Sequence, residues 1–256
     1  MGKIALITGA TAGIGEATAR VFAEEGYHVI IAGRRAQLLK ALKKELESKH
    51  NVEVTPLALD IRDAKQCQAA LDSLSEEFAQ IDVLVNNAGL AAGFDPIDKA
   101  DPNDWDRMID TNIKGLLYIS RIVARGMVER GGGHIINIGS IAGTQPYENG
   151  VVYSATKHAV HGLSQGMRMD FLKHGIKVTE ILPGMVETEF SLVRFEGDKQ
   201  RADKVYAGVK PLEGEDVAEA ALWAASQPAH VNINEIMLTS INQATMYHIH
   251  RQPEKE

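Results

Sequence analysis

The chain is short of the features that mark secreted, membrane or disulfide-rich proteins. It has one cysteine, Cys67, which cannot form a disulfide within the chain. Its apolar runs fall well short of the ~20 residues that cross a bilayer. No charged leader with a long apolar run precedes the first apolar segment, MGKIALITGA. We therefore expect a soluble, cytoplasmic protein.

Basic charge is also scarce, because 27 lysines and arginines face 34 aspartates and glutamates and leave a net charge of −7. The two signs are interspersed along the chain, and no basic stripe is present. Nucleic acids and anionic membranes are bound through such stripes. The charge pattern thus argues against both partners and leaves a small molecule as the expected ligand.

Short apolar segments alternate with longer amphipathic ones along the whole chain. Strands that are each followed by a helix indicate a parallel sheet covered on both faces. We predict a doubly wound, Rossmann-type α/β fold with seven parallel strands, as a single domain over residues 1–256. The predicted strands are Lys3–Thr8, Tyr27–Ala32, Val52–Leu59, Ile81–Asn86, His134–Ile138, Lys177–Leu182 and Ile233–Thr239. The predicted helices are Ile14–Glu25, Ala36–Lys49, Ala64–Ala79, 103–129, 150–173 and Asp216–Ser226.

Residues 185–214 form the least regular part of the pattern, rich in Gly, Asp, Lys and Arg. Long connections at the carboxyl end of such a sheet often cover a substrate. We expect these residues to act as a substrate lid.

The first predicted strand ends in a glycine-rich turn, TGATAGIGEATA, that opens directly onto a helix. Backbone amides and the positive end of a helix bind a pyrophosphate, and glycines let the backbone approach it closely. A tight strand-to-helix turn without function is the alternative. The residues of this turn expected to bind a cofactor are Thr8, Gly9, Thr11, Gly13, Ile14 and Gly15.

The second predicted strand lacks the acid that usually holds the ribose 2′-hydroxyl of NAD. Arg34 and Arg35 stand there instead, in the stretch IIAGRRAQ. Guanidinium groups pair with a 2′-phosphate, which a carboxylate would repel. We therefore predict NADP(H) as cofactor. Two solvated arginines at the start of a helix are the alternative.

Two further strand ends fit the same pocket. Asp60, followed by Ile61, is expected to accept from the adenine amino group; capping the next helix is an equally good role for Asp60. The stretch after the fourth strand, Asn86 to Gly89, offers small residues and amides for a wall against the adenosine ribose. Its expected cofactor residues are Asn87, Ala88 and Gly89.

Tyr153 and Lys157 lie four residues apart in YSATK, within a predicted helix, so their side chains share a face. The pair is either an ordinary surface pair or an acid whose proton is made easier to lose by a cation. A phenol has a pKa of about 10, too high for efficient exchange near neutrality. A nearby ammonium lowers that pKa most effectively inside a desolvated site.

Six motifs follow one another along essentially the whole chain. They are T-G-x-x-x-G-I-G at 8–15, N-N-A-G at 86–89, Asn112 in DTNIKG, Ser140 in NIGSIAG, Y-x-x-x-K at 153–157 and P-G-M-V-E-T at 183–188. Together they resemble the short-chain dehydrogenase/reductase family. One departure is Gly139, where many relatives carry a serine.

The resemblance implies a catalytic tetrad of Asn112, Ser140, Tyr153 and Lys157. Tyr153 would exchange a proton with the carbonyl oxygen, and Ser140 would hydrogen-bond that oxygen. Lys157 would lower the tyrosine pKa and hold the nicotinamide ribose, while Asn112 would steady a water in a proton relay. The residues expected beside the nicotinamide are Pro183, Gly184, Val186 and Thr188.

The lid resembles that of NADP-dependent 3-hydroxy acid dehydrogenases and of reductases of small anionic aldehydes such as malonic semialdehyde or sulfoacetaldehyde. A small anionic substrate needs a cation, for which Arg194 is the candidate; a surface pairing with Glu187, Glu189 or Glu196 is the alternative. Gln145 and Tyr147 are expected to line the pocket or simply to pack. Ser140 and Tyr153 complete the expected substrate contacts.

Other readings stay open at this point. A 3-oxoacyl-carrier-protein reductase would need a basic docking patch, for which Arg121, Arg125, Arg130 and Arg168 are available. A catalytically inactive cofactor sensor or scaffold is a third, although all four tetrad positions are filled. No metal site is expected, because His248 and His250 lack further ligands. The resemblance also implies a homotetramer.

Overall fold

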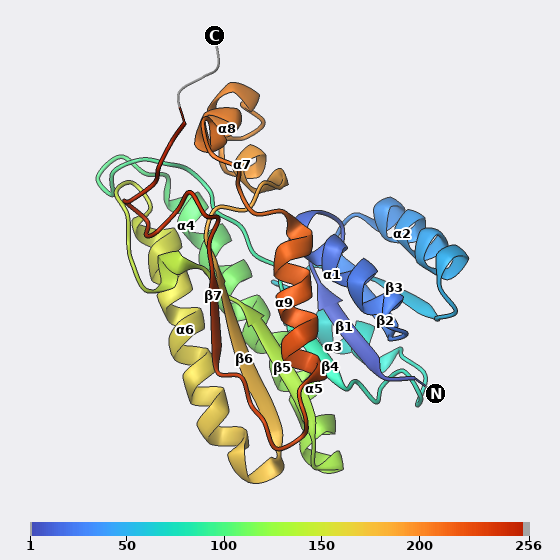
Figure 1. Ribbon diagram of the computed structural model, residues 1–256. Coiled ribbons are helices and arrows are strands. Elements are labelled where there is room, and N and C mark those ends of the chain that lie inside the picture. The colour runs from blue at the N-terminus through green and yellow to red at the C-terminus, as the bar shows by residue number, and fades with distance from the viewer. Residues whose placement is uncertain (1, 253–256) are drawn as a thin grey trace.

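The computed structural model describes residues 2–252. Their seven strands form one parallel sheet in the order β3-β2-β1-β4-β5-β6-β7 (Figure 1). The predicted doubly wound fold is confirmed. The strands are β1 Ile4–Thr8, β2 His28–Gly33, β3 Val54–Ala58, β4 Val83–Asn86, β5 Gly133–Ile138, β6 Ile176–Pro183 and β7 Glu235–Leu238. The helices are α1 Gly13–Glu24, α2 Ala36–Lys49, α3 Ala64–Asp72, α4 Pro102–Ile109, α5 Leu116–Arg130, α6 Val151–Phe171, α7 Glu189–Arg194, α8 Lys199–Tyr206 and α9 Gly214–Ser226.

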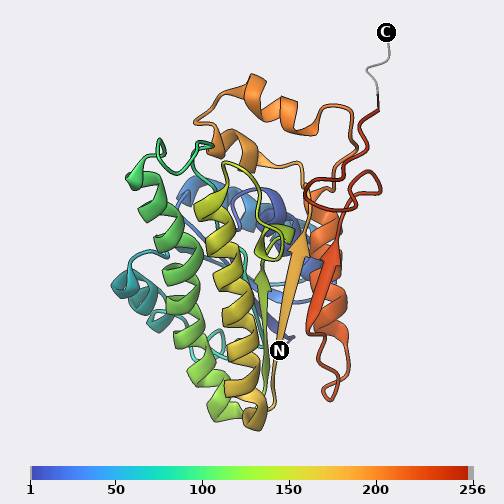
Figure 2. The same ribbon diagram turned by 90° about the vertical axis from the view of Figure 1, so that its left-hand side faces the viewer.

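Helices cover both faces of the sheet (Figure 2). Successive strand residues point to opposite faces, so Leu6 and Leu84 pack with α3, α5 and α6, whereas Ile7 and Val85 pack with α1, α2 and α9. Burying each of these side chains stabilises the fold by about 1.5–3 kcal/mol. This two-sided burial explains why the strands read as continuous apolar runs. None of the described helices is long and apolar enough to cross a membrane.

The predicted long helix over 103–129 is wrong in one respect. It is interrupted between α4 and α5 by a π-helical segment, η1, at Asp110–Gly115. Ile61 packs so closely against Gly115 that a β-carbon there would lie 2.6 Å from the isoleucine side chain. The wider turn also carries Asn112, which is buried. Local widening of this kind often occurs at functional positions.

The lid contains more regular structure than its sequence suggested, since α7 and α8 lie within residues 185–214 and stand above the carboxyl ends of the strands (Figure 2). The segment after β7 reaches back to the lid. The Gln252 amide donates to the Gly208 carbonyl over 2.7 Å, and Arg251 Nη2 donates to the Val205 carbonyl over 3.1 Å. The end of the described chain therefore holds the lid from outside.

One row of polar side chains crosses the face of the sheet that packs against α5 and α6. Asn86, Asn137, Glu180 and Glu235 are register partners on β4, β5, β6 and β7. Asn137 accepts a 2.9 Å hydrogen bond from Asn86 and donates one of 2.9 Å to Ser164. This row brings a carboxylate into an otherwise apolar layer.

Candidate active site

A cleft opens at the carboxyl ends of the strands and below the lid. Seventeen of the residues expected to bind the cofactor line it: Gly9, Thr11, Gly13, Ile14, Arg34, Arg35, Asp60, Ile61, Asn87, Ala88, Gly89, Tyr153, Lys157, Pro183, Gly184, Val186 and Thr188. Ser140 lies on the same wall. Thr8 and Gly15, in contrast, lie behind the glycine turn. Positions spread over 180 residues of sequence thus meet in one place.

The glycine turn is held tightly against the fourth strand. Thr8 Oγ1 accepts from the backbone amides of Asn87 and Ala88 over 3.0 and 3.1 Å. Asn87 Nδ2 donates to the Thr8 carbonyl over 2.9 Å. No side chain fits at position 15, because a β-carbon on Gly15 would lie 2.3 Å from the Gly9 carbonyl oxygen. Thr8 and Gly15 therefore shape the turn from behind.

The start of α1 fits a bound anion. Gly9 and Gly13 have φ angles of 68° and 52°, which glycine adopts most easily. The residue before the helix, Ala12, provides no side-chain cap, so the first amides of α1 face the cleft without a side-chain acceptor. A phosphate oxygen at that point would satisfy these amides and the positive end of the helix.

Arg34 and Arg35, which the sequence could not rank, differ in their contacts. Arg35 Nη1 pairs with Glu189 Oε2 of the lid over 2.9 Å, and its Nε donates to Thr11 Oγ1 over 3.1 Å. The Arg34 side chain makes no hydrogen bond or ion pair within residues 2–252, and it lines the cleft. Arg34 is thus the guanidinium that is available to an incoming phosphate, whereas Arg35 ties the glycine turn to the lid.

Asp60 keeps a place in the cleft but does not cap the next helix. The Asp63 carboxylate caps α3, accepting from the amides of Lys65 and Gln66. Asp60 instead pairs with Arg62 over 2.6 Å, and this hydrogen-bonded pair holds the carboxyl pKa below its usual range. The helix-cap role expected as an alternative for Asp60 is therefore wrong, because the chain makes a further turn before α3 begins.

The four expected tetrad residues come from three separate segments. Tyr153 and Lys157 lie one turn apart on α6, with Lys157 Nζ 5.9 Å from the centre of the tyrosine ring. Lys157 Nζ donates to the Ile138 carbonyl over 2.9 Å. Ser140 follows β5 and accepts from the Ala142 amide over 3.1 Å, which fixes its hydroxyl at the cleft wall.

Asn112 lies one layer behind the cleft. Its side chain exchanges two hydrogen bonds with the backbone of Leu90, accepting from the amide over 2.9 Å and donating to the carbonyl over 2.8 Å. It also donates to Thr156 Oγ1 on α6 over 3.0 Å. Asn112 therefore joins the loop after β4 to the helix that carries Tyr153 and Lys157.

Burial dominates the electrostatics of the tyrosine–lysine pair. It raises the pKa of Tyr153, against smaller lowering effects of the Ser140 hydroxyl and the Arg194 cation. It lowers the pKa of Lys157 to about 8, an effect that the negative charge of Glu180 opposes. The sequence led us to expect a lowered tyrosine pKa. In the protein alone, burial acts in the opposite direction on the tyrosine pKa. The expectation included the positive nicotinamide of a bound oxidised cofactor, and it stays a prediction.

Arg194 of α7 reaches over the catalytic helix into a ring of aromatic side chains. Its guanidinium carbon lies 4.7 Å from the ring centre of Phe94, 5.3 Å from that of Tyr147 and 5.9 Å from that of Tyr153. Its Nε donates to the Gly93 carbonyl over 3.2 Å. No ion pair among the described residues involves Arg194, so the surface pairing with lid glutamates is not formed.

Two aromatic residues of this ring were missed by sequence reasoning. Phe94 stacks on Tyr147 with 6.4 Å between ring centres, and Phe190 meets the Tyr153 ring edge-on at 5.5 Å. Their only signal in the sequence was a position in long loops beside other site residues. Gln145 lies outside the cleft, where its Oε1 accepts from the Met246 amide over 3.1 Å.

Comparison with known proteins agrees with this geometry. A family model described as short chain dehydrogenase matches residues 3–198. The NADP-dependent 3-hydroxy acid dehydrogenase YdfG of Salmonella typhi is 50% identical over 242 residues, which are 94% of this chain and 96% of that protein. Sulfoacetaldehyde reductase 2 of Chromohalobacter salexigens is 44% identical over 245 residues, 95% of this chain and 96% of that protein. The closed form of a serine dehydrogenase complexed with NADP⁺ superposes with a TM-score of 0.91 at 48% identity, covering 97% of this chain and 100% of that one.

Proposed function

Since this chain belongs to the short-chain dehydrogenase family, we propose that it is an NADP(H)-dependent oxidoreductase of small anionic alcohols and aldehydes. The substrates are 3-hydroxy acids such as serine, allo-threonine or 3-hydroxypropionate, with malonic semialdehyde and sulfoacetaldehyde as related aldehydes. One observation carries this substrate class: the Arg194 cation stands beside Tyr153 without a carboxylate partner in the described chain.

The cleft residues fit an NADP(H) molecule along its length. The amides at the start of α1 would hold the pyrophosphate, and Arg34 would hold the 2′-phosphate. Asp60, Ile61 and the stretch 87–89 would bind the adenosine. Lys157 would hold the nicotinamide ribose, and Pro183, Gly184, Val186 and Thr188 would bind the nicotinamide. When bound in its reduced form, the cofactor supplies the hydride for carbonyl reduction.

Tyr153 is the general acid in reduction and the general base in oxidation. As the carbonyl carbon is reduced, the Tyr153 hydroxyl gives its proton to the developing alkoxide, and Ser140 donates a hydrogen bond to the same oxygen. The tyrosinate that remains is stabilised by the Lys157 ammonium. Lys157 then gives a proton back to Tyr153 and regains one from solvent through a water that Asn112 and its backbone partners position.

Arg194 binds the carboxylate or sulfonate end of the substrate. The three surrounding rings partly cover the guanidinium of the half-buried Arg194, which strengthens an ion pair with a bound anion relative to one in open water. Arg194 lies on α7, within the lid at 185–214, so substrate binding and closure of the lid are coupled. The ion pair between Arg35 and Glu189 adds a second tie between lid and cofactor site.

Initial rates with matched anionic and neutral alcohols test this function. We expect turnover of L-serine, D-serine, allo-threonine, 3-hydroxypropionate or 2-hydroxyethanesulfonate, and a much lower kcat/KM for the neutral 1,3-propanediol. NADP⁺ should exceed NAD⁺ by about 10- to 100-fold in kcat/KM, as expected for a hydrogen-bonded charge at the 2′-phosphate. Equal rates with neutral and anionic alcohols, or turnover only of carrier-bound acyl groups, would contradict the substrate class.

We also propose that four copies assemble, in the cytoplasm, into a homotetramer. A tetramer with two-fold axes needs two separate contact surfaces. Two exposed apolar sites suit them: Met169 and Leu172 near the end of α6, 73% and 80% exposed, and Trp223 on α9, 53% exposed. Burying them between copies would remove apolar surface from water.

Light scattering after size-exclusion chromatography should therefore give a mass four times the 27.9 kDa of one chain. Trp223→Glu and Met169→Glu should each break one contact surface and leave a dimer, since the other surface remains. A monomer in the wild-type protein would refute the assembly without touching the proposed chemistry.

A further inference from the structure

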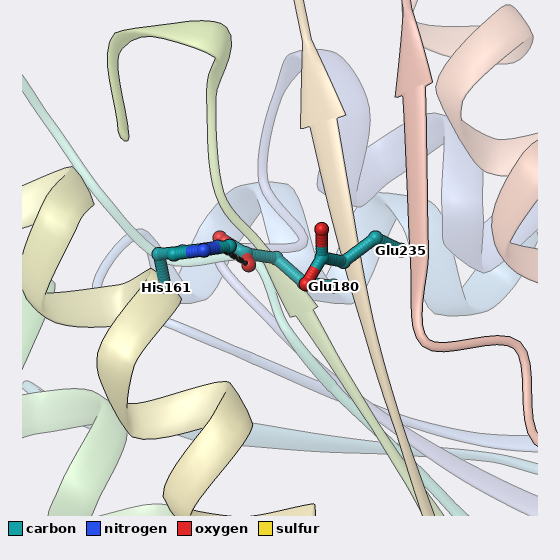
Figure 3. Close-up of side chains that lie close together, drawn as sticks. All are labelled: His161, Glu180 and Glu235. Atoms are coloured by element: carbon teal, nitrogen blue, oxygen red, sulfur yellow. Dashed lines mark hydrogen bonds and ion pairs between the residues drawn. The ribbon is translucent and has the colours of Figure 1, made fainter. Parts of the chain in front are cut away.

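Glu180 is a buried carboxylate that the proposed reaction does not use. It lies in the middle of β6 with no exposed surface, in register with Glu235 of β7 and facing α6. Its Oε2 is 2.7 Å from His161 Nδ1, and its Oε1 has no hydrogen-bond partner among the described residues. Figure 3 shows the side chains of His161, Glu180 and Glu235 converging between helix α6 and the sheet.

The carboxylate lies directly behind the catalytic wall of the cleft. A β-carbon at Gly139 would stand 2.3 Å from Glu180 Oε1, so only glycine fits next to Ser140. The peptide that joins Ile138 to Gly139 contributes the carbonyl that accepts from Lys157 Nζ over 2.9 Å. His161, one turn after Lys157 on α6, holds the carboxylate from the other side.

The charges around Glu180 can be assigned one by one. The Gln165 amide nitrogen lies 3.0 Å from His161 Nε2, and His161 Nδ1 lies 2.7 Å from the Glu180 carboxylate. Burial raises the pKa of the Glu180 carboxyl, whereas the hydrogen bond to His161 and the charge of Lys157 lower it and favour the carboxylate. Glu235 has a cation of its own, Arg168, at 3.9 Å. Among the charges of residues 2–252, Glu180 is the one that raises the Lys157 pKa against the effect of burial.

We propose that Glu180 is a positioning residue that keeps Lys157 protonated and directed at the Ile138 carbonyl, with His161 fixing the carboxylate and Gly139 leaving room for it. An ammonium buried in a site this dry loses its proton easily unless an opposite charge stands nearby. A carboxylate one layer behind the cleft supplies that charge without competing with substrate. Only its effect on rate rests on the proposed function; its effect on Lys157 does not.

His161, Glu180 and Glu235 also offer three ligand atoms within 4.8 Å of one another, as a metal site would. Two contacts favour the ionic network instead. The Glu180 carboxylate already accepts the Nδ1 proton of His161, and the Arg168 guanidinium stands beside Glu235. A divalent cation would have to replace the His161 proton on the Glu180 carboxylate and bind beside the positive charge of Arg168.

Glu180→Gln, which removes the charge and keeps the shape, tests the proposal. In the apoprotein, the pKa of Lys157 is read from the pH dependence of its acetylation by acetic anhydride, followed by peptide mass spectrometry. We expect this pKa to fall by about 1 unit. Because the ammonium exists only below its pKa, the alkaline limb of kcat/KM for aldehyde reduction should move to lower pH by a similar amount.

Three variants separate charge from packing. Glu235→Gln removes the neighbouring carboxylate and should leave the labelling pKa of Lys157 unchanged, whereas Glu180→Asp keeps the charge and should retain most of the wild-type value. If Glu180→Gln does not fold, Gly139→Ala displaces the same carboxylate and should shift the labelling pKa in the same direction. An unchanged Lys157 pKa in the folded variant overturns the proposal. Turnover that fails on every substrate, with the labelling shift present, refutes the proposed function alone.

Discussion

Replacing Tyr153 by phenylalanine should lower kcat/KM at least about 10³-fold in both directions, as expected for loss of a general acid–base group. The ring stays, so the edge contact with Phe190 and the packing around Arg194 are kept. Only the hydroxyl that exchanges a proton with the carbonyl oxygen is lost. NADPH affinity, measured by fluorescence of the bound cofactor, should therefore change little.

Tyr27→Phe is the matched control for this variant. Tyr27 is also buried and its pKa is also raised by burial, but it packs against Phe22 far from the cleft. We expect wild-type kinetics from it. A Tyr153→Phe enzyme with more than a tenth of wild-type activity would exclude Tyr153 as the proton donor.

Replacing Arg194 by alanine should reduce kcat/KM for 3-hydroxypropionate by about 10²- to 10³-fold, the usual cost of removing a desolvated charge partner. The rate with 1,3-propanediol should change by less than about threefold, because that alcohol offers no anion for the guanidinium to bind. Steady-state kinetics with the two alcohols measure this difference directly. Arg194→Lys should recover part of the loss, since it restores the charge without the planar fork.

A second lid arginine provides the control. Arg201 of α8 stacks on Phe195 with its guanidinium carbon 4.5 Å from the ring centre, in the same kind of contact that Arg194 makes with Phe94. Arg194 also lies over the Tyr153 ring, whereas the ring contact of Arg201 among the described residues is with Phe195 alone, so Arg201→Ala should leave both substrates unaffected. Equal losses on the anionic and neutral alcohols in Arg194→Ala would assign the arginine to lid packing instead.

Local patterns were enough to predict most of the fold. Strands buried on two faces read as short apolar runs, and every strand before β7 is followed by a helix, so the parallel direction of the strands could be predicted from the sequence. The glycine turn was equally visible, because Gly9 and Gly13 adopt positive φ angles that the spacing of the turn demands. The tetrad residues were named through the resemblance of their short motifs to those of the short-chain dehydrogenase/reductase family, and their catalytic roles stay a prediction.

Features that depend on contacts between distant segments were not predicted. The π-helical turn at Asn112 forms where Ile61, from another part of the chain, presses on Gly115. The pairing of Arg35 with Glu189 spans 154 residues and separates two neighbouring arginines that look alike in sequence. The charge of Glu180 did leave a signal: a lone acid in the apolar run Ile176–Pro183 implies a buried partner.

The thiol of Cys67 is fully buried under α5, and burial raises its pKa to about 11. A thiol of this kind stays protonated and inaccessible at neutral pH, so alkylating dyes will not label it. The native chain therefore accepts one engineered cysteine as a unique attachment point for a fluorophore. Placed at Leu192, on the exposed side of α7 and two residues from Arg194, such a dye would report opening and closing of the lid in single molecules during turnover.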